Sequence, residues 1–406
     1  MNFIDLFAGA GGLSEGFIKA GYEPIAHVEL DKAACFTLRT RAAFHWLRKE
    51  KKDAIYNSYL KGEISREELY QSVPKDLLKS VINAKIGDDN DQVFNTIEDL
   101  LNGAEVDLII GGPPCQAYSY IGRAALKHKT DDERTKLYIQ YGRFLKRYSP
   151  RVFVFENVPG ILTAGKGQYY KNLKKYYRGL GYNVEAKLHN AYDYNVVQNR
   201  ERVIIIGWRR DIKFKYPKVK KSTKRYYRDD IFNDLPAIKP GEKRRYIKYS
   251  QPTNEYLSGN EIRNCVDFVT QHITRPHNDK DLNIYMLAIN MINVGTRIKN
   301  NLIPENMRTQ KNTTDFLDRF KVVDTEPHTM IAHIAKDGHH FIHYDKKQLR
   351  SISIREAARI QSFQDNYYFE GIKETQPRTA AFKQIGNAVP PLLAYAIAKR
   401  IKNMLK

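Results

Sequence analysis

Cysteine is scarce in this chain, which has only three among its 406 residues, Cys35, Cys115 and Cys265. So few and so widely spaced cysteines indicate neither a disulfide framework nor a zinc site, and they are typical of a protein of the reducing cytosol. The chain also lacks any apolar run close to the roughly 18 residues of a membrane span. Residues 1–7 have no basic segment and already follow a strand pattern, so we do not expect a signal peptide. These absences predict a cytoplasmic protein without a membrane segment.

Acidic residues are also fewer than basic residues. The chain has 46 Asp and Glu residues against 67 Lys and Arg, which gives a formal net charge of +21. Such a balance favours polyanionic partners, most often nucleic acid, although charge by itself also serves general solubility. With 42% apolar residues the chain is expected to be globular, and its length suffices for two domains.

The most informative stretch is 107–116, with the sequence Asp-Leu-Ile-Ile-Gly-Gly-Pro-Pro-Cys-Gln. Its apolar run predicts a buried parallel strand. The two glycines then allow a tight turn, and the two prolines stiffen the residues that follow. Cys115 is therefore expected on a rigid loop at the carboxyl edge of a sheet, where open α/β sheets bind ligands. A lone cysteine is more often an inert core residue, but a core cysteine does not need such a loop.

A glycine-rich turn stands near the start of the chain. Residues 4–7 predict a strand, residues 8–14 a glycine turn, and the following residues an amphipathic helix. Strand, glycine turn and helix begin a nucleotide-binding βαβ unit. The second strand, 25–28, ends in Glu29, and a carboxylate at this place commonly holds ribose hydroxyls. By itself this pattern also suits a dinucleotide-dependent oxidoreductase.

Two further apolar strands have polar groups at their ends. The strand 152–155 is followed by Glu156, which parallel-sheet geometry can place beside Cys115. The strand 203–206 is preceded by three alternating polar residues, which share one face of an extended chain: Gln198, Arg200 and Arg202. Such a face offers fixed hydrogen-bond donors to a base or a phosphate.

The remaining segments indicate the domain organisation. Residues 33–85 are charged and have helical periodicity, which predicts two or three helices inserted into an α/β core. The charged loop 117–134 has the character of a lid over an active site. From 209 to 248 basic residues interleave with aromatics, a composition that suits phosphate contacts and base stacking, and hydrophobic periodicity stays poor to about 349. We therefore expect a core domain of residues 1–208 plus 350–406, and a smaller, irregular domain of residues 209–349.

In this order, and over the whole chain, the motifs resemble those of the cytosine-C5 DNA methyltransferases. The most specific are Pro-Pro-Cys-Gln at 113–116, Phe-Glu-Asn-Val at 155–158 and Gln-x-Arg-x-Arg at 198–202. The resemblance implies an α/β fold with the Rossmann-like sheet of S-adenosylmethionine-dependent methyltransferases. It also implies that 209–349 is a target recognition domain, braced by a motif at 350–363.

The resemblance further implies the site residues. Cys115 matches the nucleophile, Glu156 the catalytic glutamate and Arg202 the arginine that contacts the target cytosine, and Arg200 is expected to act beside them. The implied cofactor is S-adenosylmethionine and no metal is implied. The positions that match cofactor-binding residues are Asp5, Phe7, Ala8, Gly9, Ala10, Gly11, Gly12, Glu29, Leu30, Asp88, Asp89, Pro114, Asn387 and Ala388. Asp89 departs from the family, which usually has an apolar residue there, and Gln364 stands where the family usually has proline.

The expected reaction is methyl transfer to carbon 5 of a cytosine flipped out of double-stranded DNA, through a covalent adduct with Cys115. The expected setting is a bacterial restriction–modification system with a separate cognate endonuclease, and the enzyme is expected to be a monomer.

Three alternatives stay open: a tRNA cytosine-C5 methyltransferase, a catalytically silent DNA-binding protein on the same scaffold, and a dinucleotide oxidoreductase. The long basic region after Trp208 favours DNA over tRNA. The complete set of Cys115, Glu156 and Arg202 disfavours a silent protein, and an oxidoreductase does not explain the Pro-Cys-Gln motif.

Overall fold

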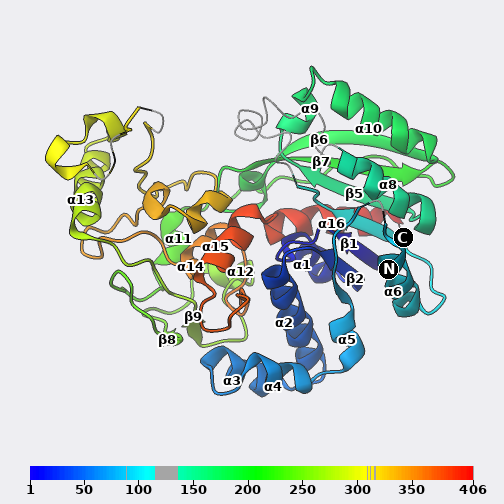
Figure 1. Cartoon of the computed structure of the whole chain (residues 1–406), viewed down its shortest axis with the longest axis horizontal. Helices are drawn as coiled ribbons and strands as arrows, with labels where there is room; N and C mark the ends of the chain where they lie inside the picture. The colour runs from blue at the N-terminus through cyan, green and yellow to red at the C-terminus, as the bar shows by residue number, and fades with distance from the viewer. Residues whose placement is uncertain (88, 115–135, 309, 311, 315–316, 406) are drawn as a thin grey trace.

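A seven-stranded, mainly parallel sheet lies at the centre of the computed structural model (Figure 1). The structure describes residues 1–87, 89–114, 136–308, 310, 312–314 and 317–405. Along the sheet the strands follow the order β3-β2-β1-β4-β5-β7-β6. The strands from β3 to β5 are parallel, whereas β7 runs antiparallel to both β5 and β6. Their bounds are β1 (Asn2–Leu6), β2 (Glu23–Glu29), β3 (Val81–Asn83), β4 (Leu108–Gly111), β5 (Val152–Asn157), β6 (Tyr182–Asn190) and β7 (Glu201–Arg209).

Helices cover both faces of the sheet, which explains why its inner strands are continuous apolar runs. In β1, Phe3 packs into the core on one face, while Ile4 and Leu6 pack into the core on the other. The first face carries α1 (Gly12–Lys19) and α16 (Pro391–Leu405). The second carries α6 (Asp91–Leu101), α8 (Leu137–Tyr148) and α10 (Gln168–Gly179). The predicted α/β fold class is thus confirmed.

The expected strands and the order of glycine turn and helix are present, but the sequence patterns missed β6. Its residues are mostly polar, and several of them are exposed at the edge of the sheet, so no apolar run marks it. The antiparallel direction of β7 was also not foreseen. That direction matters, because it brings the amino end of β7 next to the carboxyl end of β5.

The segment 33–85 is helical for most of its length but not throughout. It contains most of α2 (Lys32–Lys49), then α3 (Asp53–Lys61), α4 (Arg66–Gln71) and α5 (Lys75–Lys79). Two or three helices were expected, whereas the segment holds four and ends in β3, which pairs with β2 as the edge strand of the main sheet. Three residues are too short a run for periodicity to reveal a strand.

The helices α3 and α4 connect distant parts of the chain. Arg245 donates to the backbone oxygens of Tyr59 at 2.9 Å and Leu60 at 3.2 Å. Leu60 also shares a hydrophobic cluster with Phe268 and Tyr368. The inserted helices therefore pack against a two-stranded hairpin of the following region, formed by β8 (Tyr246–Lys248) and β9 (Phe268–Thr270).

Residues 209–349 form short elements rather than a second large sheet. Besides β8 and β9 they include α11 (Arg228–Phe232), α12 (Glu255–Gly259) and α13 (Asp279–Asn293), with 3-10 turns at Asn300–Leu302, Glu305–Met307, Ala332–Ala335 and Gly338–His340. Among the described residues of this region, α13 and its neighbours have a hydrophobic cluster of their own. Most other buried apolar residues of the region share a core with the C-terminal helices, whereas Phe268 packs with the inserted helices. We call this region the smaller lobe, and Figure 1 shows α13 at its far end. The boundaries at 209 and 349 stay predictions.

The C-terminal helices join the two lobes. They are α14 (Ile354–Ile360), α15 (Arg378–Asn387) and α16. Two shorter helical segments lie earlier in the chain, at Gly160–Thr163 (α9) and Ala191–Tyr194. Arg359 of α14 is fully buried and pairs with both Asp365 and Asp234, the latter from the smaller lobe. Gly386 and Asn387 end α15, and the last helix begins at Pro391. In the described part of the chain no helix is long and apolar enough to cross a membrane.

Candidate active site

A cleft of about 850 Å³ opens at the carboxyl ends of β1, β2, β4 and β5. Its volume suits a cofactor-sized ligand, since such sites usually enclose about 300–1,000 Å³. Most of the site residues expected from the sequence line it together: Asp5, Phe7, Ala8, Gly9, Ala10, Gly12, Glu29, Leu30, Pro114, Glu156, Arg202, Asn387 and Ala388.

The glycine turn between β1 and α1 forms one wall of the cleft. Gly9 has a φ of +55° and nothing lies within 4 Å of where a Cβ would stand, so its open side faces free space. Gly12 packs tightly instead, because a Cβ there would lie 2.2 Å from the backbone oxygen of Val389. Gly11 does not line the cleft, and a Cβ on it would lie 2.8 Å from Leu38. Gly11 therefore shapes the turn, which differs from the ligand contact expected for it.

Two carboxylates stand beside this turn. The Glu29 side chain accepts hydrogen bonds from the backbone N–H groups of Gly9 at 2.8 Å and Asp31 at 2.7 Å. Burial raises the pKa of Glu29, and these two hydrogen bonds offset part of that effect. Asp5 accepts a hydrogen bond from Ser14 on Oδ2. Its other oxygen, Oδ1, is buried and has no hydrogen-bond partner among the described residues. A buried acceptor without a partner fits a cationic or donor group of a ligand.

Glu156 and Arg202 form an ion pair at the other wall. Because β7 is antiparallel to β5, Glu156 lies opposite Ile204, and Arg202 at the start of β7 reaches it. The distance from Arg202 Nε to Glu156 Oε1 is 2.7 Å, and the two side chains are 12% and 11% exposed. Burial raises the pKa of Glu156, and the attraction of Arg202 and Arg200 offsets only part of this. The carboxyl group is thus poised to hold a proton at higher pH than an ordinary glutamate.

The same strand end holds the loop that leads to the expected nucleophile. Asn157 donates from Nδ2 to the backbone oxygen of Pro113 at 3.1 Å. A Cβ on Gly112 would lie 2.8 Å from Glu156 Oε2, so only glycine allows this close approach. Cys115 itself, and the loop 117–134 after it, lie outside the described residues.

Arg200 takes a place that differs from the catalytic one expected for it. The side chain is 1% exposed, and Arg200 is absent from the cleft lining. Its guanidinium donates to the backbone oxygens of Met330, Gly386 and Ala388. Gln198 is also buried and bonds to Gln361 at 2.8 Å. Of the three alternating polar residues, only Arg202 therefore reaches the cleft.

Of the two acidic residues expected at the cofactor, Asp89 is the one that the structure describes. Asp88 lies outside the described residues. Asp89 is exposed, does not line the cleft, and accepts a hydrogen bond from the N–H of Asp91 at 3.1 Å at the start of α6. Where the family usually has an apolar residue, Asp89 thus stands just before α6 and accepts a hydrogen bond from its first residue. This placement does not fit the cofactor role expected for Asp89.

Several cleft residues were missed because no motif marks them. They come from the ends of β3 and α8 and from the C-terminal helices: Ala84, Lys85, Ile86, Gly87, Lys136, Leu137, Gln140, Lys383, Gln384 and Val389. Residues 84–87 follow β3, the strand that the sequence patterns did not reveal. Since an edge strand and its loop come beside the cleft only through tertiary pairing, periodicity gave no signal for them.

Comparison with known proteins agrees with this geometry. The family model for C-5 cytosine-specific DNA methylases matches residues 1–65 and 69–403. The chain is 40% identical to the type II methyltransferase M.Bpa9945I of Bacillus paralicheniformis, covering 100% of this chain and 99% of that protein. It is 32% identical to the type II methyltransferase M.DdeI of Desulfomicrobium norvegicum, covering 99% and 88%.

Solved structures show the same fold. A prophage-encoded protein of E. coli, described as a DNA modification methyltransferase, matches with a TM-score of 0.67 and 22% identity over 100% of this chain and 99% of that one. The methyltransferase EhMeth of Entamoeba histolytica matches with a TM-score of 0.55 and 14% identity, covering 100% and 99%. Because the family model spans nearly the whole chain and a 40% identical relative covers it end to end, this chain belongs to the C-5 cytosine-specific DNA methylase family.

Proposed function

We propose that this enzyme transfers the methyl group of S-adenosylmethionine to carbon 5 of a cytosine in double-stranded DNA, with Cys115 as nucleophile and Glu156 and Arg202 as its partners. The observation that carries the proposal is the buried pair of Glu156 and Arg202 at the wall of the cleft. The loop that leads to Cys115 passes this pair, since Gly112 lies against Glu156.

The cleft residues fit the cofactor. The open side of Gly9 admits a ligand close to the backbone, and the unpartnered Oδ1 of Asp5 suits the cationic amino group of the cofactor. Glu29 is expected to accept from the ribose hydroxyls with its remaining lone pairs. When bound, S-adenosylmethionine supplies an electrophilic methyl group on a sulfonium.

The chain's own residues supply the rest of the chemistry. The thiolate of Cys115 adds to carbon 6 of cytosine, which makes carbon 5 nucleophilic. Negative charge then develops on the ring at N3 and O2. A protonated Glu156 donates to N3 and Arg202 donates to O2, so both stabilise this charge. Carbon 5 takes up the methyl group, and its proton then passes to water. Expulsion of the Cys115 thiolate restores the ring and releases the enzyme.

The substrate proposal rests on the family and on charge. Carbon 5 of a paired cytosine is covered inside the duplex, so the base must be flipped into the cleft. The net charge of +21 suits the phosphate backbone, and we assign residues 209–349 to target recognition. Two full-length relatives are named type II methyltransferases, which supports a restriction–modification setting with a separate endonuclease. We expect the enzyme to act as a monomer.

A methyl-transfer assay tests the proposal. Purified enzyme is incubated with S-adenosylmethionine labelled on its methyl group and with either duplex DNA or tRNA. We expect label in the DNA alone, and none with the variant Cys115→Ala. Duplexes with 5-fluorocytosine in the target position should trap a covalent enzyme–DNA complex, because the fluorine cannot leave as a proton does. Label in tRNA but not DNA, or full activity of Cys115→Ala, would overturn the proposal.

A further inference from the structure

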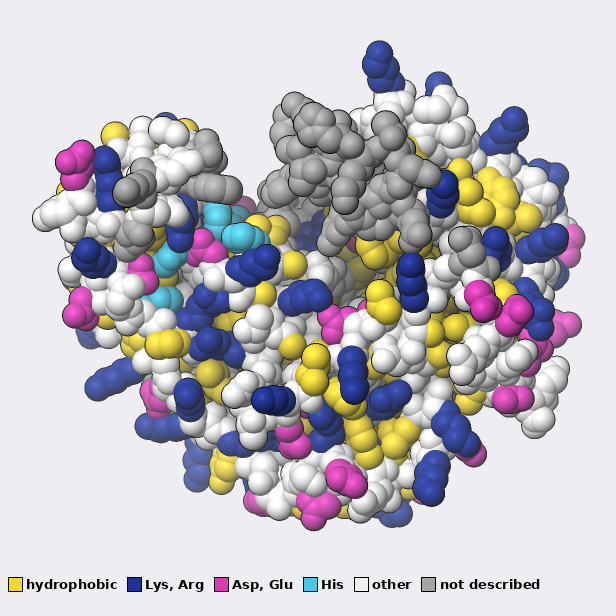
Figure 2. Space-filling view, viewed as in Figure 1, with side chains coloured by type: hydrophobic (Ala, Val, Ile, Leu, Met, Phe, Trp, Pro, Cys, Tyr) yellow, Lys and Arg dark blue, Asp and Glu magenta, His cyan; other side chains and the backbone are white. Residues whose placement is uncertain are grey.

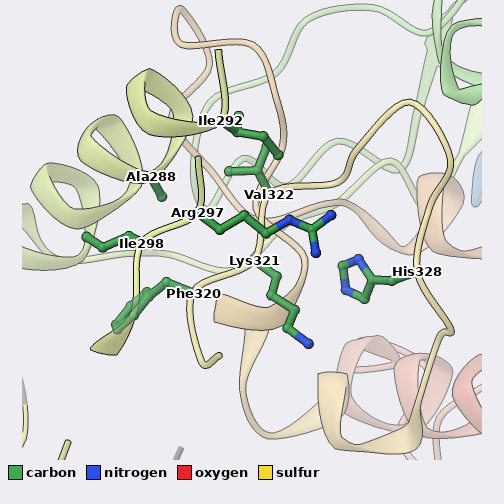
Figure 3. A pocket seen from close by; sticks show the side chains of 8 residues that line it. All are labelled: Ala288, Ile292, Arg297, Ile298, Phe320, Lys321, Val322 and His328. Carbon is green, nitrogen blue, oxygen red and sulfur yellow. The ribbon is translucent and has the colours of Figure 1, made fainter. Parts of the chain in front are cut away.

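A small pocket in the smaller lobe lies outside the cleft and carries three nitrogen-bearing side chains. Arg297, Lys321 and His328 point toward the same space, beside apolar side chains from α13, Phe320 and Val322 (Figure 3). The volume is about 20 Å³, which holds a single water-sized group. A pocket of this size excludes a cofactor or metabolite, but it can receive the polar edge of a larger ligand presented from outside.

Hydrogen bonds join the segment that carries His328 to the residues just before Arg202 of the active site. The N–H of Asn199 donates to the backbone oxygen of Pro327 at 3.3 Å, and Thr329 donates to the backbone oxygen of Asn199 at 2.6 Å. Asn199 lies three residues before Arg202. A duplex that places its cytosine against Arg202 therefore passes close to this segment. In Figure 2 histidine side chains gather on the smaller lobe beside the hollow between the lobes.

Each cation of the pocket already has a carboxylate beside it. Arg297 Nη2 lies 3.1 Å from Asp324 Oδ2, and Lys321 Nζ lies 3.8 Å from Asp318 Oδ2. Asp324 is itself held by the N–H of Thr325 at 2.7 Å. The cluster is thus close to neutral, which disfavours a phosphate. The Asp324 carboxylate instead pairs with one nitrogen of the Arg297 guanidinium, which is 70% exposed, so its other N–H groups can meet a ligand presented from solvent.

His328 is fixed in one tautomer. Its ring stacks on Phe341 with centroids 4.4 Å apart, and Nε2 lies 2.6 Å from the backbone oxygen of His340. Because a carbonyl oxygen only accepts, Nε2 carries the hydrogen. Burial lowers the pKa of His328 to about 4, so the ring is neutral at pH 7. Nδ1 is then a hydrogen-bond acceptor, with no partner among the described residues.

The geometry points to Arg297 and His328 as a reader of one G·C base pair in the major groove of the DNA substrate. Guanine presents two acceptors there, N7 and O6, which match the fork of Arg297. Cytosine presents the N4 amino donor, which matches Nδ1 of His328. This inference rests on the proposed function, because it requires duplex DNA at the cleft.

The test compares specificity with affinity. The recognition sequence is first determined with the wild-type enzyme, and each of its base pairs is then replaced in a set of synthetic duplexes. Methylation rates on this set are measured for the wild type, Arg297→Ala, Arg297→Lys, His328→Phe and Lys299→Ala. His328→Phe keeps a ring for stacking on Phe341. Lys299 is an exposed neighbour and serves as the matched control.

We expect Arg297→Ala and Arg297→Lys to lose about tenfold to a hundredfold of discrimination at one G·C pair. His328→Phe should weaken discrimination at the same G·C pair. Lys299→Ala should leave discrimination unchanged. An equal loss on all duplexes, with a shallower salt dependence and near-normal Arg297→Lys, would identify a phosphate contact and overturn the inference. Unchanged discrimination in all variants would also overturn it. If the wild type methylates no duplex, the proposed function itself fails.

Discussion

At the residue scale, two arginines two positions apart do different work. Arg200 is fully buried and donates to three backbone oxygens, whereas Arg202 reaches the cleft and pairs with Glu156. We predict that Arg200→Lys destabilises the fold by about 2–4 kcal/mol, because a lysine cannot satisfy three buried acceptors in this geometry. Urea unfolding followed by circular dichroism measures this loss.

The matched variant is Arg202→Lys. We expect it to unfold at nearly the wild-type urea concentration and yet to lose methyl transfer about 10²-fold or more, since the donor to the cytosine is displaced. An Arg200→Lys protein with unchanged stability, or an Arg202→Lys protein with normal activity, would contradict the separate roles given to the two residues.

The raised pKa of Glu156 predicts the pH dependence of the reaction. Burial favours the protonated carboxyl, so this form persists to higher pH than in a free glutamate. The fraction able to donate a proton then falls as the pH rises through the folded-state pKa. We predict that the pH–rate profile has an alkaline limb, on which the methyl-transfer rate declines as the pH rises through this pKa. We also predict that Glu156→Gln is about 10²–10⁴-fold slower.

Single-turnover rates across a pH series provide the measurement. The amide of Glu156→Gln does not titrate, so the alkaline limb assigned to Glu156 should vanish in this variant. A limb that stays at the same pH in Glu156→Gln would belong to another group.

At the element scale, the sequence predicted the strands whose ends carry chemistry. The runs that end at Leu6, Gly111 and Phe155 are apolar because both faces of the sheet are covered, and parallel neighbours place their carboxyl ends together. This is why Glu156 and the glycine turn could be assigned to one cleft from sequence.

Other elements depend on tertiary contacts that no local pattern encodes. The edge strands β3 and β6 are short or polar, and residues 84–87 reach the cleft only through β3. Arg200 was grouped with Arg202 because they alternate in sequence. Its true partners are backbone oxygens at 330, 386 and 388, more than a hundred residues away, and an isolated strand gives no sign of them.

The helices α1 and α2 are joined by a buried ion pair, which predicts a stability effect. Arg41 donates from Nε to Glu15 at 2.9 Å, and His45 lies 3.1 Å from the same carboxylate. Burial would raise the pKa of Glu15, but Arg41 and His45 outweigh it and hold this pKa well below its usual range. We predict that Arg41→Met destabilises the protein by about 3–5 kcal/mol, because it leaves the buried Glu15 carboxylate with His45 alone beside it.

The double variant Glu15→Gln/Arg41→Met should recover much of this loss, since no unpaired charge then remains. Asp76→Ala breaks the exposed pair with Lys79 and serves as the control, with no measurable change expected. Chemical unfolding of the wild type, Arg41→Met, Glu15→Gln, the double variant and Asp76→Ala tests the account. Additive losses in the double variant would show that Glu15 and Arg41 are not coupled.

At the scale of the whole molecule, charge predicts how the enzyme holds DNA. Figure 2 shows Lys and Arg side chains over both lobes, and the net charge is +21. Binding that neutralises many phosphates releases counterions, so we expect affinity for duplex DNA to fall about a thousandfold as salt rises from about 50 to about 200 mM. Fluorescence anisotropy with a labelled duplex measures the slope, and a flat dependence would contradict the electrostatic part of the account.

The central claim is that this chain methylates carbon 5 of cytosine in DNA through Cys115. The most direct measurement expresses the wild type and Cys115→Ala in a host without cytosine methylation, and sequences the host DNA after bisulfite conversion. The account predicts protected cytosines within one short sequence for the wild type and none for Cys115→Ala. No protected cytosine with a folded wild type that binds S-adenosylmethionine, or the same protection in both strains, would contradict it.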